Sequence, residues 1–220
     1  MERLDKALSG TGRWSRREVK ELLRRGRVLL DGVPAASPEQ KIDPETADIR
    51  VDGETVSCRR FTYVLLHKPK GYVSSADEPG QKSVLELVPP ELCRKDLRPV
   101  GRLDKDSTGM LLLTDDGQLA HQVIAARSHV AKYYHIVLAR PWEDGYAEKM
   151  AEGMVLADGA QCLPAKAAPV EGTDREALIC LHEGKYHQVR RMFAAAGNHV
   201  AELARIAMGG LEMPQDLEIG

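Results

Sequence analysis

Strand-like segments follow one another along most of this chain without a helix between each pair, and this order constrains the fold more than any other feature. Apolar segments with the length of strands occur at 63–66, 110–114, 133–138, 177–181 and 199–203, whereas helical periodicity is found at 118–126, 144–153 and 187–196. Parallel sheets require a regular alternation of strands and helices. The sequence therefore predicts an α+β fold built on a mostly antiparallel sheet flanked by helices.

A smaller unit precedes this sheet. Residues 3–9 have the spacing of a short helix, and Ser15 with Glu18 forms a capping box that starts a second helix, which ends at Gly26. Short strands are predicted at 28–30 and 49–51, each followed by an Asp-Gly turn. We therefore expect a small domain at 1–57, a linker at 58–62 and a larger domain at 63–220.

Positive charge is concentrated at the N-terminus. The whole chain has a net charge of −2, whereas residues 1–27 contain nine Lys and Arg against four Asp and Glu. Arg16, Lys20 and Arg24 recur one turn apart on the second helix, and no acidic residue at i+4 neutralises this stripe. Such a stripe is typical of a solvated helix face or of a surface that binds phosphate groups, and the excess of one sign favours the second interpretation.

Membrane proteins, secreted proteins and zinc proteins are disfavoured by the sequence. No apolar run approaches the ~20 residues of a membrane span, and the first residues lack the apolar core of a secretory signal. Cys58, Cys93, Cys162 and Cys180 are far apart and form no Cys-x-x-Cys pair, which argues against a disulfide framework or a zinc site. We therefore expect a cytoplasmic protein that does not contact a membrane.

The loop before the strand at 110–114 is the first candidate for chemistry. It contains Arg102, Asp104 and Asp106, followed by Ser-Thr-Gly. A carboxylate held beside an arginine on an anchored loop stays ionised and suits nucleophilic attack or the stabilisation of a sugar cation. These physical arguments do not choose between Asp104 and Asp106, and a polar turn that caps the strand is the structural alternative.

The helix at 187–196 is the second candidate. Its core face consists of Val189, Met192 and Phe193, so Arg190 and Arg191 are polar residues close to its start. The helix macrodipole favours anions at that end. These arginines are therefore expected to have a carboxylate or phosphate partner, although ordinary surface charge is the alternative.

The strand at 133–138 is the third candidate. Tyr133 and Tyr134 are adjacent, so an extended strand directs them to opposite faces of the sheet, one toward the core and the other toward a site. A strand tyrosine more often serves packing than catalysis. With an ordinary pKa of ~10, a phenol is also a poor base unless the site stabilises its anion.

Together these segments resemble the motifs of the RsuA-type pseudouridine synthases. The run Gly-Arg-Leu-Asp-Lys-Asp-Ser-Thr-Gly at 101–109 resembles the catalytic motif, and Lys-Tyr-Tyr at 132–134 and the segment 183–192 resemble the second and third motifs. Residues 66–72 resemble an Asn-Lys-Pro-x-Gly element, with His67 in place of the usual Asn. Residues 2–57 resemble the S4-like RNA-binding domain.

The resemblance implies roles for particular residues. Asp104 is implied as the catalytic aspartate, Tyr134 as the active-site tyrosine and Arg190 as the basic residue that pairs with Asp104. Pseudouridylation involves no redox step and no transferred external group, so no cofactor and no metal is expected. The residues predicted to contact RNA are Arg3, Lys6, Arg16, Arg17, Lys20, Arg24, Arg27, Lys68, Lys70 and Arg102.

The resemblance also implies a substrate. It predicts isomerisation of one uridine in 16S (small-subunit) ribosomal RNA by a monomeric bacterial enzyme, with an assembly intermediate of the ribosomal subunit as partner. A sibling synthase acting on 23S ribosomal RNA and a non-catalytic rRNA-binding assembly factor with the same fold are the alternatives. The assembly factor would not need Asp104, Tyr134 and Arg190 together.

Overall fold

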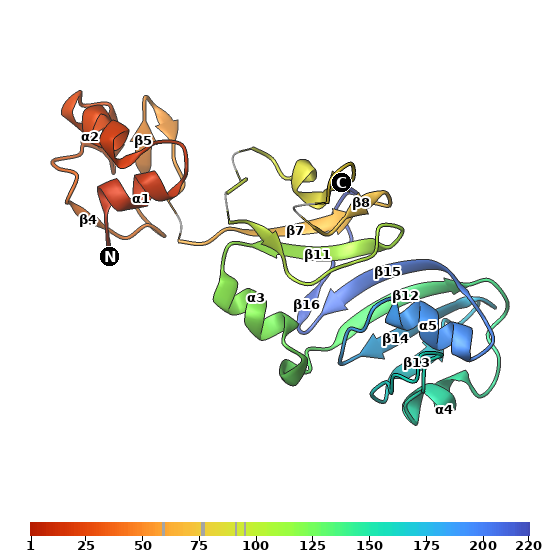
Figure 1. Ribbon diagram of the computed structural model, residues 1–220. Coiled ribbons are helices and arrows are strands. Elements are labelled where there is room, and N and C mark those ends of the chain that lie inside the picture. The colour runs from red at the N-terminus through yellow and green to blue at the C-terminus, as the bar shows by residue number, and fades with distance from the viewer. Residues whose placement is uncertain (59, 76–77, 91, 95) are drawn as a thin grey trace. The chain divides into compact units, whose positions relative to one another are not determined.

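The computed structural model describes residues 1–58, 60–75, 78–90, 92–94 and 96–220. The chain divides into two compact units (Figure 1). The first contains Met1–Thr62 and Leu92–Leu97, and the second contains Tyr63–Glu91 and Arg98–Gly220. Among the described residues, no helix combines the length and the apolar character that crossing a bilayer requires.

The first unit consists of two helices and short strands around one apolar core. Helices α1 (Leu4–Gly10) and α2 (Arg16–Arg24) pack against each other. The strands are β1 (Glu2–Arg3) paired with β4 (Lys41–Ile42), and a sheet of order β3 (Val33–Pro34), β2 (Val28–Leu30), β5 (Ile49–Val51), β6 (Glu54–Thr55). The predicted capping box is confirmed, because the Ser15 side chain accepts from the amide of Glu18 and Glu18 accepts from the amide of Ser15.

The second unit is built on an eight-stranded sheet (Figure 1). Its path is β10 (Arg98–Pro99), β11 (Thr108–Thr114), β15 (Val200–Met208), β12 (Lys132–Leu138), β14 (Glu176–Leu181) and β13 (Lys166–Pro169), with β7 (Tyr63–Lys68) on β11 and β16 (Leu211–Glu212) on β15. Every pairing in this sheet is antiparallel except β11 with β15. The predicted α+β class with a mostly antiparallel sheet is therefore confirmed.

The remaining elements of the second unit lie outside this sheet. Helix α4 (Tyr146–Ala151) contacts β13, and helix α5 (Gln188–Ala195) contacts β15. Helix α3 (Gly117–Ile124) follows β11. The smaller elements are β8 (Tyr72–Val73) paired with β9 (Lys82–Ser83), and the 3-10 helices η1 (Val84–Leu87) and η2 (Ala126–Ser128). The predicted core face of α5 is confirmed, because Val189, Met192 and Phe193 are all buried.

Two irregularities shape the centre of the sheet. Gly109 has a φ of 101°, and a Cβ at this position would lie 2.2 Å from the backbone oxygen of Arg205, so only glycine lets β11 approach β15 this closely. Across β12 and β15, Tyr133 is opposite Ala207 while Tyr134 is opposite Arg205. The extra residue, Ile206, is a β-bulge, which places Arg205 on the same face of the sheet as Tyr134.

Candidate active site

Lys68, at the end of β7, anchors the loop between β10 and β11. Its side chain is fully buried, and Nζ donates to the carbonyl oxygens of Pro69 (3.1 Å), Asp104 (3.0 Å), Lys105 (3.4 Å) and Ser107 (2.7 Å). Burial lowers the pKa of Lys68 to about 8, although Asp106 and Asp104 oppose the shift. The prediction that Lys68 contacts RNA is therefore wrong: its amine is committed to the loop backbone.

Each of the two candidate carboxylates in this loop has its own basic partner. Oδ1 of Asp104 lies 3.3 Å from Nε2 of His187, and Oδ2 of Asp106 lies 2.8 Å from Nη2 of Arg190. The predicted pairing of Arg190 with Asp104 is therefore wrong in this structure. Arg190 reaches the neighbouring carboxylate two residues along the loop, while its Nη1 donates to the carbonyl oxygen of Val200 (2.8 Å).

The expectation that the arginines at the start of α5 have acidic partners is confirmed. Arg190 pairs with Asp106, and Arg191 pairs with Asp158 at 2.5 Å. The macrodipole makes this end of a helix unfavourable for cations, and the two carboxylates compensate for it. The Arg190 ion pair links α5 to the loop that carries Asp104.

His187 is a site residue that the sequence did not reveal. It precedes α5 in the left-handed backbone region, with φ 47° and ψ 36°, and its ring stacks on that of Tyr186 with centroids 3.9 Å apart. A positive φ is uncommon for a residue with a side chain and clusters at functional sites. The sequence offered only the spacing of the histidines, which bears on metal binding and says nothing of backbone conformation.

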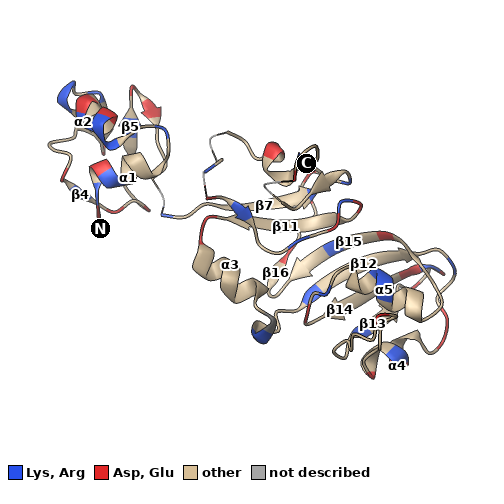
Figure 2. Cartoon of the chain, in the orientation of Figure 1, with Lys and Arg blue, Asp and Glu red and all other residues tan. Residues whose placement is uncertain are grey.

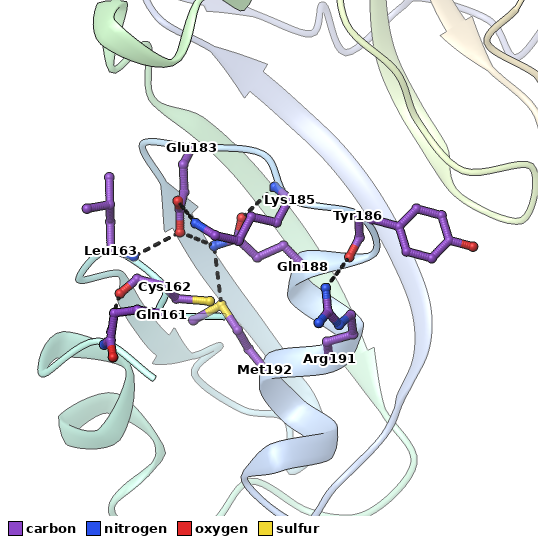
Figure 3. A network of polar contacts seen from close by, with 9 residues as sticks. All are labelled: Gln161, Cys162, Leu163, Glu183, Lys185, Tyr186, Gln188, Arg191 and Met192. Carbon is purple, nitrogen blue, oxygen red and sulfur yellow. Dashed lines mark hydrogen bonds and ion pairs between the residues drawn. The ribbon is translucent and has the colours of Figure 1, made fainter. Parts of the chain in front are cut away.

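The segment that carries His187 is held by a polar network centred on Glu183 (Figure 3). Oε1 of Glu183 accepts from the amide of Leu163 (2.8 Å) and from Nε2 of Gln188 (2.6 Å), and Oε2 pairs with Nζ of Lys185. The amide of Lys185 in turn donates to Oε1 of Gln188 (2.8 Å). Burial raises the pKa of Glu183, but the hydrogen bonds from Lys185, Leu163 and Gln188 outweigh it and hold the pKa below its ordinary value.

Tyr134 and Asp104 line one open cavity. The cavity has a volume of about 1360 Å³ and is also lined by Arg102, Asp106, His187 and Arg205. Tyr134 is 8% exposed and Tyr133 is 40% exposed, which confirms that the strand directs them to opposite faces. A carboxylate and a phenol facing one cavity can act on a sugar and on a base placed between them.

Two cations lie beside Tyr134 on the same face of the sheet. Burial lowers the pKa of Arg205, and the adjacent phenol of Tyr134 opposes the shift. Burial and the charge of Arg205 lower the pKa of Lys132, whose Nζ donates to the carbonyl oxygen of Val130 (3.1 Å). The sequence did not point to Arg205, because its place opposite Tyr134 depends on the bulge at Ile206.

The cations predicted to contact RNA in the first unit fall into two groups. Lysines and arginines alternate with acidic residues along α2 (Figure 2). Four of the cations form ion pairs, which are Arg3 with Asp5 and Glu39, Lys6 with Glu2, Arg24 with Glu21 and Arg27 with Asp52. The expectation of an unneutralised stripe is therefore wrong for Arg24, which Glu21 reaches at i−3. Within the described residues, Arg16, Arg17 and Lys20 are exposed and form no ion pair.

The remaining candidates lie in the second unit. Arg102 is exposed and lines the cavity, and Lys70 is exposed and pairs with Glu202 at 3.2 Å. The described residues contain no cluster of three or more His, Cys, Asp or Glu side chains that could hold a metal ion. His67, which stands where the resemblance implies Asn, hydrogen-bonds through Nδ1 to the carbonyl oxygen of Leu217 (3.2 Å).

Comparison with known proteins agrees with this arrangement. Residues 62–195 match the model of the RNA pseudouridylate synthase family, and residues 2–47 match the S4 domain. The chain is 40% identical to ribosomal small subunit pseudouridine synthase A of Yersinia pestis and 38% identical to that of Escherichia coli, over 99% of this chain and 92% and 94% of the relatives. An uncharacterized RNA pseudouridine synthase of Bacillus subtilis is 39% identical over 99% of this chain and 92% of its own length.

A solved structure has the same fold over the whole chain. A crystal structure of a pseudouridylate synthase superposes with a TM-score of 0.67 at 33% identity, covering 100% of this chain and 94% of the other. Sequence and fold thus agree over both units, and the enzyme is an isomerase that makes pseudouridine. The chain belongs to the RNA pseudouridylate synthase family.

Proposed function

We propose that this enzyme converts one uridine of bacterial small-subunit ribosomal RNA into pseudouridine, and that Asp104 is its catalytic carboxylate. The observation that carries the proposal is the position of Asp104, which faces a cavity shared with Tyr134 on a loop whose backbone is fixed by Lys68. The relatives from Yersinia pestis and Escherichia coli, named for the ribosomal small subunit, support the choice of substrate.

The structure supports Asp104 over Asp106 as the reacting group. The side chain of Asp104 is 27% exposed, whereas that of Asp106 is 65% exposed and is engaged with the guanidinium of Arg190. A more enclosed carboxylate is better shielded from water and closer in character to an active-site group. In this arrangement Arg190 acts on the loop through Asp106, and His187 is the basic group beside Asp104.

The reaction needs a sugar and a base held on either side of one bond. The carboxylate of Asp104 assists at C1′ of the ribose while the bond from C1′ to N1 breaks with both electrons remaining on the base. Tyr134 lies on the cavity face of β12, where a flat base can stack on its ring. The base then turns, C5 forms the bond to C1′, C5 releases its proton and N1 takes one up.

The division of labour follows the domain boundaries expected from the sequence. Residues 1–57 bind RNA, residues 58–62 link the parts, and residues 63–220 carry out the isomerisation. Arg16, Arg17 and Lys20 in the first unit, and Arg102 and Lys70 near the cavity, contact the RNA backbone. The enzyme acts as a monomer in the cytoplasm on an assembly intermediate of the small subunit.

The test is pseudouridine mapping with carbodiimide on ribosomal RNA from a strain that lacks the protein. One small-subunit position should lose its pseudouridine, and the wild-type protein should restore it. Asp104→Asn should leave that position unmodified while changing RNA affinity by no more than a few-fold, because a neutral amide of the same shape cannot act at C1′.

Asp106→Asn is the matched control, since it removes the equivalent charge two residues away. It should retain turnover, reduced by the loss of the Arg190 ion pair. Full activity of Asp104→Asn removes Asp104 from its role. If the strain without the protein loses a pseudouridine of the large subunit instead, the enzyme acts on that subunit. If the strain loses no pseudouridine, the protein binds ribosomal RNA without modifying it.

A further inference from the structure

Arg205 is a buried cation without an anionic partner. Its side chain is 1% exposed, Nε donates to the carbonyl oxygen of Met110 (2.9 Å), and Nη2 has no hydrogen-bond partner. The group that most favours its positive charge is the phenol of Tyr134, and no described carboxylate forms an ion pair with it. Burying an uncompensated charge is costly, so an anion that forms in the adjacent cavity is the natural partner.

The surroundings of Arg205 indicate what kind of anion fits. Arg205 is one of the residues that line the cavity, and it lies on the face of the sheet that it shares with Tyr134. Leu181, Leu203 and Met208 line the same cavity. Apolar walls with one or two fixed donors suit a flat ring with polar atoms at its edge rather than a hydrated phosphate.

Arg205 also lies close to the loop that carries Asp104. It is opposite Gly109, five residues after Asp104, and the missing side chain of Gly109 allows the two backbones to come together. Lys132, on the other side of Tyr134, adds a second positive charge to this face. A base attached to a ribose at Asp104 therefore meets a positively charged wall.

Pseudouridine formation produces a transient anion of this kind. When the bond from C1′ to N1 breaks with both electrons on the base, uracil becomes an anion whose charge is shared by N1, O2 and O4. The charge disappears when C5 uses an electron pair to bond to C1′ and the bond from C1′ to the carboxylate of Asp104 breaks, with its electron pair leaving on the carboxylate. The base is thus negative only while it is detached.

We propose that the guanidinium of Arg205 stabilises the detached uracil anion by its positive charge. The proposal rests on the proposed function. A cation that is fixed before the reaction and shielded from solvent stabilises developing charge strongly, because the surroundings need not reorganise and the local dielectric is low. The same attraction keeps the free base in the cavity while it turns.

The test compares two leaving groups. Transcripts of small-subunit ribosomal RNA are made with uridine or with 5-fluorouridine, and the single-turnover rate constant for consumption of the target nucleoside is measured. Fluorine at C5 withdraws electrons and stabilises the departing anion. Arg205→Met should slow uridine about 100-fold but 5-fluorouridine by a clearly smaller factor, because the second anion depends less on the guanidinium.

Lys68→Met is the matched control, since it also replaces a buried cation near the site but one that acts on the loop. It should slow both substrates by the same factor. Near-ultraviolet circular dichroism verifies that each variant is folded. Arg205→Lys, which keeps the charge at a shorter reach, enters the same comparison if Arg205→Met does not fold, and should show the same preference to a smaller degree.

Equal slowing of the two substrates by the Arg205 variant overturns the proposal and leaves Arg205 a structural residue. If the wild-type enzyme converts no uridine at all in small-subunit ribosomal RNA, either as a transcript or within an assembly intermediate of the subunit, the proposed function itself fails. If the wild type converts uridine and the Arg205 variant slows uridine and 5-fluorouridine by the same factor, the proposed function stands and only the role of Arg205 is lost.

Discussion

Lys68 shows how a single residue can fix the geometry of a loop. Its ammonium group has three donors, and four carbonyl oxygens surround it, three of them from the loop that carries Asp104. Loss of its proton removes a donor and turns a lone pair toward these oxygens. The loop should therefore loosen when Lys68 becomes neutral, even though the rest of the fold is unchanged.

The pH dependence follows from the direction of this shift. Burial lowers the pKa of Lys68 from 10.5 to about 8, so between these values the unfolded chain holds a proton that the folded protein has released. The free energy of unfolding therefore receives a contribution from Lys68 that increases as pH rises from about 8 to 10.5. We expect kcat to fall as pH rises through about 8 without a loss of stability attributable to Lys68.

Steady-state kinetics from pH 6 to 10, with thermal unfolding measured in the same buffers, checks this expectation. Lys68→Met should lower kcat about 100-fold below pH 8, as expected for a displaced catalytic loop, and its difference from the wild type should narrow as pH rises above 8. The exposed Lys149 provides the control, and Lys149→Met should keep the wild-type profile. A kcat that stays level up to pH 10 would contradict the role of Lys68.

At the scale of single residues, the sequence predicted types of chemistry better than partners. The motif at 101–109 indicated Asp104, and the alternation of strand faces separated Tyr134 from Tyr133. The ion pair of Arg190 could not be predicted, because Asp104 and Asp106 are two residues apart and only the loop conformation decides which one faces α5. His187 and Arg205 depend on a positive φ and a bulge, which composition does not encode.

Among the elements, the segment before α5 depends on side chains rather than on regular hydrogen bonding. Glu183 joins it to Leu163 and to Gln188 at the start of α5 (Figure 3). This network fixes the point from which His187 and Arg190 project. Its removal should therefore affect both stability and catalysis.

Glu183→Ala should lower the free energy of unfolding by about 2 kcal/mol, because a nearly buried carboxylate leaves its donors unsatisfied, and it should lower kcat more than it raises KM. Urea denaturation and single-turnover kinetics measure the two effects. The control is Glu202→Ala, which removes a carboxylate that is 64% exposed and should cost less than about 1 kcal/mol. Similar losses for the two variants would refute the role given to Glu183.

The strands were predictable where they are long and buried. The segments expected in the second unit correspond to β7, β11, β12, β14 and β15, and helices were expected where α3, α4 and α5 are found. The order of strands in the sheet could not be predicted from the sequence, because β11 and β15 are 85 or more residues apart and pair over only two positions. Strand β13, with the sequence Lys-Ala-Ala-Pro, carries no strand signal of its own and exists because it pairs with β14.

At the scale of the whole molecule, charge is divided between cations that are already paired and cations that are not. Arg16, Arg17 and Lys20 are exposed and unpaired within the described part of the chain. Arg24, Arg25 and Arg27 lie nearby in sequence but pair with Glu21 and Asp52. Phosphate groups must compete with these carboxylates for the second set but not for the first.

Replacing Arg16, Arg17 and Lys20 by Gln should therefore reduce the slope of log affinity against log salt by about 2, since each phosphate contact contributes about 0.7–0.9. Replacing Arg24, Arg25 and Arg27 by Gln removes the same formal charge and should reduce the slope less. Filter binding to ribosomal RNA from 50 to 300 mM salt compares the two variants. Equal slopes would show that binding responds to net charge alone rather than to unpaired cations.

The bulge at Ile206 changes which positions of strand β15 face the cavity. Before it, the odd positions Leu203 and Arg205 face the cavity, and after it the even position Met208 does. Removing one residue here would restore a regular ladder and move one half of the strand out of phase with the other. The cavity can therefore tolerate exchanges of side chains along β15 more readily than a change in its length, because the number of residues, as well as their identity, determines which of them meet the substrate.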